Sequence, residues 1–380
     1  MNSLYRLGAA GCFAAACLTL PSVGFAEDSI STSSVKLYGI VDTGIEYITN
    51  AALVNGSTKN LTRMTSGNMS GSRWGITGNE DLGGGTSSFF LIESGMAVDT
   101  GGLLQGNRLF GRLSYVGLAN NDFGTVSVGR IGGLFLDWAS KFNPLNNAVY
   151  AIKMMDPAFS DRLDNTIRYQ KKFGAVTAIA QYSQGYDSVA YGAEVAGDNL
   201  RGRVMETGLL YEGGDFSATL VYDQKNGSAA SPTAATTVAG GGYEGNKDKR
   251  VGAGASYKLA NVDLFAGYRY LNSKAIHLTA LTKGPVQASS LYWLGTTYHM
   301  TPNLLLSGTA MYQKFYGSTL APMSFQVDLD YFLSKRTDLY INTGYVINRG
   351  GSDLGLNGFA SSAVAGHNQL GTQIGIRHTF

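Results

Sequence analysis

Apolar and polar side chains alternate along most of the chain after residue 34. In the segment 35–47, one parity is mostly apolar and the other carries the charged residues Lys36, Asp42 and Glu46. The apolar parity consists of Val35, Leu37, Gly39, Val41, Thr43, Ile45 and Tyr47. A period of two predicts a β-strand with one face toward apolar surroundings and the other toward water.

The same alternation recurs in four further runs, at 216–223, 250–258, 262–270 and 325–331. We expect the strands that contain these runs to extend over about nine to twelve residues, whereas strands of soluble sheets average about five to six residues. A tilted strand needs roughly 9 to 11 residues to cross a bilayer. This length favours strands that span a membrane over strands of a soluble sandwich.

Short and long connections alternate between the predicted strands. The seven short connections are Asp81–Gly85, Ala119–Gly124, Lys171–Gly174, Glu212–Asp215, Ala260–Asn261, Thr301–Pro302 and Lys335–Thr337. The eight long ones are Asn50–Gly71, Asp99–Asn107, Ile131–Asp164, Gln184–Gly202, Gln224–Asp248, Lys274–Ala288, Gly317–Met323 and Asn348–His367. This pattern predicts an all-β fold, a sixteen-stranded antiparallel transmembrane β-barrel with short periplasmic turns and long external loops.

The N-terminal segment has the features of an export signal. A positive residue precedes the apolar stretch 7–20, which is too short to span a membrane, and a small-residue pattern ends at Ala26. We expect cleavage after Ala26, so that residues 1–26 are a signal peptide and 27–380 form a single barrel domain. The alternatives are a lipidated Cys17 or a buried N-terminal helix. Both cysteines, Cys12 and Cys17, lie in this segment, so disulfides do not hold the exported chain together.

Composition narrows the class of protein. Charged residues make up 15% of the chain against about 25% in ordinary globular proteins. The net charge is +2 with no basic tract, which excludes nucleic acid as a partner. The four histidines stand in no catalytic motif, and no cluster has the spacing of metal ligands, so we expect neither an enzyme, nor a cofactor, nor a metal site.

Several segments resemble the general porins of Gram-negative bacteria, of the type found in β-proteobacteria. They run in order along nearly the whole exported chain and are 35–42, 72–76, 80–83, 109–112, 115–118, 123–126, 129–130, 162–169 and 375–380. The resemblance implies a sixteen-stranded barrel in the bacterial outer membrane that assembles as a homotrimer surrounded by lipid. It also implies that the third external loop, within Ile131–Asp164, folds into the lumen, and that the terminal Phe380 acts as an assembly signal.

The resemblance places a pore constriction at this third loop. The loop offers the acids Asp137, Asp156, Asp161 and Asp164 and the bases Lys141, Lys153 and Arg162. Flanking strands carry Arg73, Arg112, Arg130 and Arg168, which we interpret as a basic wall facing the acidic loop residues across the channel. The alternative is that these arginines only balance interior carboxylates such as Glu93 and Glu206. The sign of the selectivity stays open, with the wall favouring anions.

A barrel of sixteen strands is wide enough to enclose water instead of packed side chains. We therefore expect passive diffusion of ions and small hydrophilic solutes. Two other functions remain open, a substrate-selective channel of the same fold and a surface adhesin or receptor barrel with a plugged lumen.

Overall fold

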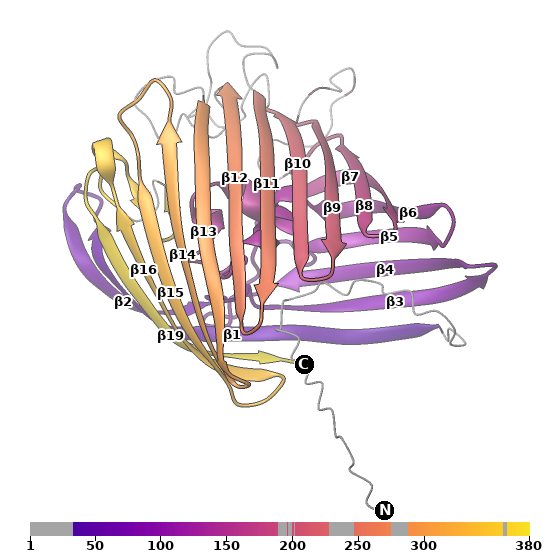
Figure 1. Cartoon of the computed structure of the whole chain (residues 1–380), viewed down its shortest axis with the longest axis horizontal. Coiled ribbons are helices and arrows are strands. Elements are labelled where there is room, and N and C mark those ends of the chain that lie inside the picture. The colour runs from indigo at the N-terminus through magenta and orange to yellow at the C-terminus, as the bar shows by residue number, and fades with distance from the viewer. Residues whose placement is uncertain are drawn as a thin grey trace, which may run out of the picture.

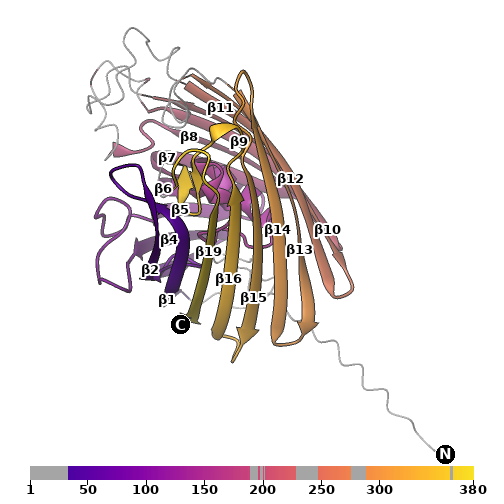
Figure 2. The ribbon, with the colours of Figure 1, turned by 90° about the vertical axis from the view of Figure 1, so that its left-hand side faces the viewer.

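The computed structural model describes residues 33–188, 196, 200, 202–227, 247–274, 288–359 and 363–380. The expected signal peptide lies outside these residues. One antiparallel sheet curls around a lumen until its ends meet, as Figures 1 and 2 show from two sides. Within the described ranges, no helix is both long enough and apolar enough to cross a membrane.

The sheet closes where the first and last strands pair. Strand β1 (Ser34–Ala52) runs antiparallel to β19 (Gln369–Thr379), with Ile40 opposite Thr379 and Ile48 opposite Gly371. Closure gives β1 and β19 a strand partner on each edge, and each backbone group left unpaired in lipid would cost several kcal/mol. The predicted closed barrel is confirmed.

The other edge of β1 is shared by two strands. Strand β3 (Arg73–Gly83) pairs with the first part of β1, and β2 (Thr58–Ser66) pairs with the later part. The two together fill one position, so the seventeen strands of the sheet occupy sixteen positions around the barrel. The expectation that all of Asn50–Gly71 is a loop was therefore wrong, because β2 lies inside it.

The break between β2 and β3 is held by one inward carboxylate. Asp42 accepts hydrogen bonds from the backbone N–H groups of Met69 (2.8 Å) and Ser70 (2.6 Å), and from the Tyr340 hydroxyl (2.6 Å). These bonds satisfy backbone donors that would otherwise pair along the strand. The strand therefore leaves the ladder here and enters it again at Arg73.

The remaining strands follow in sequence order. They are β4 (Thr86–Gly95), β5 (Leu113–Asn120), β6 (Gly124–Gly132), β7 (Arg162–Phe173), β8 (Val176–Ser183), β9 (Val204–Gly213), β10 (Phe216–Asn226), β11 (Lys247–Leu259), β12 (Val262–Lys274), β13 (Ala288–Thr301), β14 (Leu304–Phe315), β15 (Met323–Phe332) and β16 (Thr337–Ile347). Connections of two to four residues join β3–β4, β5–β6, β7–β8, β9–β10, β11–β12, β13–β14 and β15–β16. These seven short turns lie where the sequence predicted them, all at the same end of the barrel.

The alternating pattern separates the outer face from the lumen. Val35 and Leu37 are 70% and 65% exposed on the outer surface, whereas Asp42 and Glu46 of the opposite parity are fully buried inside. An apolar outer band and a polar interior are the arrangement expected of a barrel in lipid. The predicted assignment of the two parities is confirmed.

The chain between β6 and β7 folds into the lumen, where Figures 1 and 2 show it surrounded by strands. We call residues 133–161 the inner loop. It contains four short helices, α1 (Leu134–Asp137), η1 (Ala139–Phe142), η2 (Ile152–Met154) and η3 (Pro157–Ser160). Its inward course confirms the expectation drawn from the family resemblance.

Large side chains of the inner loop lie against glycines of the wall. Phe135 contacts Gly252 and Phe142 contacts Gly254 closely. A Cβ atom added at Gly252 would lie 2.5 Å from the Phe135 ring, and one added at Gly254 would lie 2.7 Å from the Phe142 Cβ. The indole of Trp293 donates a hydrogen bond of 2.7 Å to the Phe142 carbonyl. Glycines in the wall thus leave the space in which the loop packs.

A second segment reaches the lumen from the connection between β16 and β19. It begins with a short turn, η6 (Arg349–Gly351), and forms the hairpin β17 (Leu354–Gly355) and β18 (Gly358–Phe359). Leu354 and Leu356 are fully buried in the same apolar cluster as the inner loop. This end of the lumen is therefore narrowed by two segments.

The packing of the inner loop predicts a large effect of Trp293→Ala. The substitution removes an indole that is 1% exposed, its hydrogen bond to Phe142 and its edge contact with Phe159. We expect a loss of about 3–5 kcal/mol. Guanidinium unfolding of the detergent-solubilised barrel, followed by circular dichroism, measures it.

Tyr292→Ala is the matched control, because Tyr292 is the next residue, points outward and is 44% exposed. Its loss should be clearly smaller. Equal shifts in the unfolding midpoint for the two variants would contradict the packing of the inner loop against β13.

Candidate functional site

Four arginines of neighbouring strands face the lumen and form the basic wall. Arg73 lies on β3, Arg112 directly precedes β5, Arg130 lies on β6 and Arg168 on β7. Their side chains are only 10–14% exposed. Strands β3 to β7 pair in order, so the sheet brings the four arginines predicted from the sequence onto one side of the lumen.

Glu93 of β4 is the carboxylate partner of the first two arginines. Its oxygens lie 3.4 Å from Arg73 Nε and 2.5 Å from Arg112 Nε, and one also accepts a hydrogen bond of 2.9 Å from the Tyr38 hydroxyl. Glu93 is fully buried. Two guanidinium groups therefore share one carboxylate, which leaves an excess of positive charge on this part of the wall.

Asp164 holds the third arginine. It forms ion pairs with Arg130 and, at 3.1 Å, with Arg108, and it accepts two hydrogen bonds of 3.0 Å from the backbone N–H and hydroxyl of Ser188. Arg108 also pairs with Asp187 at 2.9 Å. Asp164 is thus fully engaged by its neighbours on the wall.

The three predicted acids within the inner loop bind cations of the wall strands. Asp137 pairs with Arg168 at 2.8 Å, and Asp161 pairs with Lys225 of β10. Asp156 lies between Arg250 Nε of β11 at 3.1 Å and Arg269 Nε of β12 at 2.9 Å. These carboxylates anchor the loop to β7 and β10–β12.

Asp156 is the most strongly held of these carboxylates. Burial alone would raise its pKa, but the Arg250 and Arg269 guanidinium groups hold the pKa of Asp156 at about 2. It also accepts a hydrogen bond of 3.0 Å from the Ala158 backbone N–H and so caps η3. Asp156 therefore stays ionised and fixes the course of the loop.

Two further cations beside the basic wall have no carboxylate partner among the described residues. Lys153 of η2 forms no ion pair there, and Arg162 donates one hydrogen bond, of 3.0 Å, to the Ser160 carbonyl. Burial, together with the charges of Arg162 and Arg112, lowers the pKa of Lys153 to about 8, and Asp42 acts in the opposite direction. Lys153 and Arg162 therefore add positive charge to the region between the inner loop and the basic wall, which we call the gap.

The middle of the inner loop is tied to β1. The Tyr150 hydroxyl donates a hydrogen bond of 2.8 Å to Glu46, which also pairs with Arg63 at 2.6 Å and accepts a bond of 3.0 Å from Gln373. The alternating pattern predicts that Glu46 faces the water-facing side of β1 but indicates no partner for it. Tyr150 is 104 residues away in the sequence, and nothing in the local pattern indicates this contact.

The alternative interpretation, that the arginines only balance interior carboxylates such as Glu93 and Glu206, applies to some of them. Glu93 does neutralise part of the charge of Arg73 and Arg112. Glu206 instead accepts hydrogen bonds from the Leu134 backbone N–H (2.9 Å) and from the Gln181 amide, so it holds the start of the inner loop.

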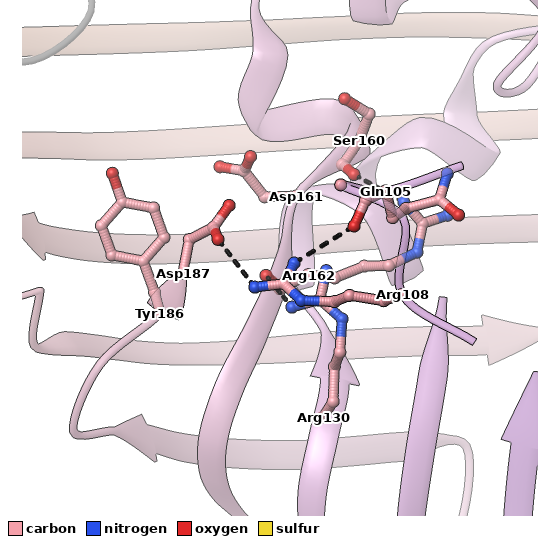
Figure 3. A pocket seen from close by; sticks show the side chains of 9 residues that line it. Gln105, Arg108, Arg130, Ser160, Asp161, Arg162, Tyr186 and Asp187 are labelled. Atoms are coloured by element: carbon pink, nitrogen blue, oxygen red, sulfur yellow. Dashed lines mark hydrogen bonds and ion pairs between the residues drawn. The ribbon is translucent and has the colours of Figure 1, made fainter. Parts of the chain in front are cut away.

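A polar cavity of about 270 Å³ lies beside the gap, and Figure 3 shows its lining side chains. Its walls come from three of the long connections and the adjoining strand ends. The lining residues are Gln105, Gly106, Arg108, Arg130, Ser160, Asp161, Arg162, Tyr186 and Asp187. Within the part of the chain that the structure describes, no group of three or more histidine, cysteine, aspartate or glutamate residues could hold a metal ion.

Comparison with known proteins identifies the family. The family model described as Gram-negative porin matches residues 9–351. An outer membrane porin protein of Bordetella pertussis is 28% identical over 387 residues, covering 94% of this chain and 97% of that protein. Outer membrane porin protein 32 of Delftia acidovorans is 30% identical over 382 residues, covering 93% and 95%.

Solved structures share the fold. The anion-selective porin from Comamonas acidovorans superimposes with a TM-score of 0.74 at 24% identity, covering 92% of this chain and all of that one. The trimer form of OmpT, an outer membrane protein of Vibrio cholerae, superimposes with a TM-score of 0.64 at 14% identity and covers 92% of this chain. The closed barrel, the match along most of the chain and the two relatives together show that this chain belongs to the Gram-negative porin family, channel proteins of the bacterial outer membrane and not enzymes.

Proposed function

We propose that the chain forms a water-filled channel for passive diffusion of small hydrophilic solutes and ions, and that the gap beside the inner loop is its constriction and favours anions. The unequal distribution of charge around this gap is the observation that carries the proposal. The residues concerned are those predicted from the sequence, together with Lys153 and Arg162.

The acids of the inner loop contribute little charge to the gap. Asp137, Asp156 and Asp161 each pair with a cation of the wall strands. The fourth predicted acid, Asp164, lies at the end of the loop and is engaged by Arg130 and Arg108. Of the four predicted acids, Asp137 pairs with Arg168 and Asp164 with Arg130, so two of them are engaged by the basic wall itself.

Cations outnumber carboxylates around the gap. Arg162 interacts electrostatically with Arg112, Arg130 and Arg73, and Glu93 is the acid that offsets them there. Arginine stays protonated in any environment, so like-charged neighbours do not discharge one another by losing protons. A narrow passage lined by excess positive charge raises the local concentration of anions and lowers that of cations.

The assembly and processing of the chain are part of the same proposal. We infer that residues 1–26 are removed on export and that residues 27–380 form one barrel, which assembles as a homotrimer in outer-membrane lipid. The trimer form of OmpT, a barrel with a similar fold, supports this oligomeric state. The relative described as anion-selective agrees with the direction of the charge preference, which is argued from the side chains of this chain.

Arg73→Ser and Arg112→Ser should each shift the channel toward cations. Each substitution removes one charge from the gap and leaves Glu93 with one remaining arginine. We expect the chloride-to-potassium permeability ratio to fall roughly twofold or more. Reversal potentials in a potassium chloride gradient across a planar bilayer measure this ratio.

Arg336→Ser is the control, because Arg336 lies exposed in the short turn between β15 and β16. It loses the same charge at the far end of the barrel and should leave the ratio unchanged. If the variants of Arg73 and Arg112 behave like the control, these residues do not line the constriction.

Glu93→Gln should act in the opposite direction. The amide keeps the shape of the side chain but removes the negative charge beside Arg73 and Arg112. The permeability ratio should rise in favour of chloride, most clearly at low ionic strength, where exposed charges are least screened. A shift toward potassium would show that Glu93 does not offset the positive charge at the gap.

Lys153 should make the selectivity depend on pH. Its pKa is lowered to about 8, so it carries a charge at pH 7 and loses it as the pH rises to 9. The anion preference of the native channel should therefore decrease over this interval. Lys153→Met should start from the lower preference and change little, whereas Lys153→Arg should keep the high preference throughout. Equal pH profiles for native, Met and Arg channels would exclude Lys153 from the gap.

A further inference from the structure

We propose that the inner face of β15 and β16 binds one hydrated divalent cation, such as Ca²⁺ or Mg²⁺, through the Asp328 carboxylate and the amide oxygens of Asn342 and Gln326. We call these three residues the acceptor cluster. The inference does not depend on the proposed channel function, because the acceptor cluster lies on strands other than those of the basic wall.

Asp328 is a buried carboxylate without a partner. It has the lumen-facing parity of β15, since its neighbours Val327 and Leu329 are exposed on the outer surface, and it is only 3% exposed. Its Oδ1 atom accepts no hydrogen bond, and the carboxylate joins no ion pair within the described ranges. A buried carboxylate is stable only when hydrogen bonds or an opposite charge replace the water that it has lost. Asp328 therefore requires a partner that these residues do not supply.

Two amide oxygens beside Asp328 are also unpaired. Asn342 lies directly opposite Asp328 in the antiparallel pair, and Gln326 is the preceding lumen-facing residue of β15. The Asn342 amide nitrogen donates to Gln373 Oε1 at 3.3 Å, and that of Gln326 donates to Ser324. Both side-chain oxygens are buried and accept no hydrogen bond. Opposed side chains of paired strands begin about 4.5–5.5 Å apart, so one ion can reach oxygens of both strands.

The unpaired atoms of the acceptor cluster are all oxygens that accept hydrogen bonds, which favours a cation as the ligand. Ca²⁺ binds carboxylate and amide oxygens at about 2.3–2.6 Å and Mg²⁺ at about 2.0–2.1 Å, and both take water at the remaining positions. One carboxylate and two amide oxygens suit such an ion. This donor set differs from a group of three acidic or histidine ligands, which the described part of the chain does not contain.

The neighbouring lumen-facing positions add negative charge. Asp330 and Asp338 both pair with Arg377, at 2.9 and 3.0 Å, and each has one further buried oxygen without a hydrogen bond. The charge of Arg377 also reaches Asp328, but those of Asp338 and Asp42 oppose it. Three carboxylates, those of Asp328, Asp330 and Asp338, against one guanidinium leave an excess of two negative charges. One divalent cation neutralises this excess.

The middle of the inner loop lies over this part of the wall, where β15 and β16 run side by side (Figure 2). Asn143 of the loop donates a hydrogen bond of 3.4 Å to Thr309 of β14, which lies opposite Gln326. Leu145 belongs to one buried apolar cluster with Tyr340 of β16. The cation therefore lies between the loop and the wall, where side chains exclude most of the bulk water.

Equilibrium dialysis of the detergent-solubilised exported chain against calcium chloride tests the proposal. Metal is first removed with EDTA, and bound calcium is then counted per chain, with magnesium chloride in a separate arm and sodium chloride of equal ionic strength as the blank. The native chain should bind one saturable calcium or magnesium ion more than Asp328→Asn. The variant keeps the shape of the side chain but removes its charge, so the affinity should fall roughly tenfold or more. Asp328 pairs with no described residue, so the barrel of the variant should still fold.

Two further variants serve as controls. Asp122→Asn removes an equal charge from the exposed turn between β5 and β6 and should bind calcium like the native chain. Asn342→Asp adds a second carboxylate to the acceptor cluster and should lower the dissociation constant, because affinity rises with the number of charged ligands.

Urea unfolding with and without calcium distinguishes a bound ion from a protonated Asp328. Calcium should raise the urea midpoint of the native chain and of Asp122→Asn and leave that of Asp328→Asn unchanged, because only a folded state that binds the ion is stabilised by it. A protonated Asp328 gives a native midpoint that does not respond to calcium. That result, or equal calcium binding by the native chain and Asp328→Asn, overturns the site. Neither measurement involves ion flow, so both are independent of the anion preference.

Discussion

The position of Asp156 between Arg250 and Arg269 is the interaction on which the lumen depends. All three side chains are almost completely withdrawn from water, at 0–2% exposed. Removing one partner of a buried ion pair costs about 3–5 kcal/mol, because it leaves the other charge without compensation. If the inner loop left the wall, Asp156 and its two arginines would lose their pairing, and this cost holds the loop in place. Asp137 and Asp161 add further ion pairs between the loop and the wall strands.

The anchoring of the loop and the charge of the gap have one cause. Carboxylates that bind the loop to β7 and β10–β12 no longer contribute negative charge to the opposite side, where Arg73 and Arg112 share Glu93. Lys153 of the inner loop and Arg162 at the start of β7 add to the positive charge of the basic wall. The net charge of the whole chain is only +2, so the positive excess at the gap arises because carboxylates of the inner loop pair with cations elsewhere in the lumen.

The barrel could be predicted from the sequence because strand pairing follows local alternation. The exposure of Leu37 and the burial of Asp42 both follow from the period of two. Strand β2 escaped prediction because its exposed apolar residues, Leu61 and Met64, are three positions apart, lie on opposite faces of the strand and so break that period. It forms because β1 extends to Ala52 and offers it a paired edge.

The residues of the site could be predicted from the sequence, but which of them form ion pairs with one another could not. Inward arginines and loop acids can be recognised from parity and position, yet Asp156 and Arg250 are 94 residues apart and meet only because the loop crosses the lumen.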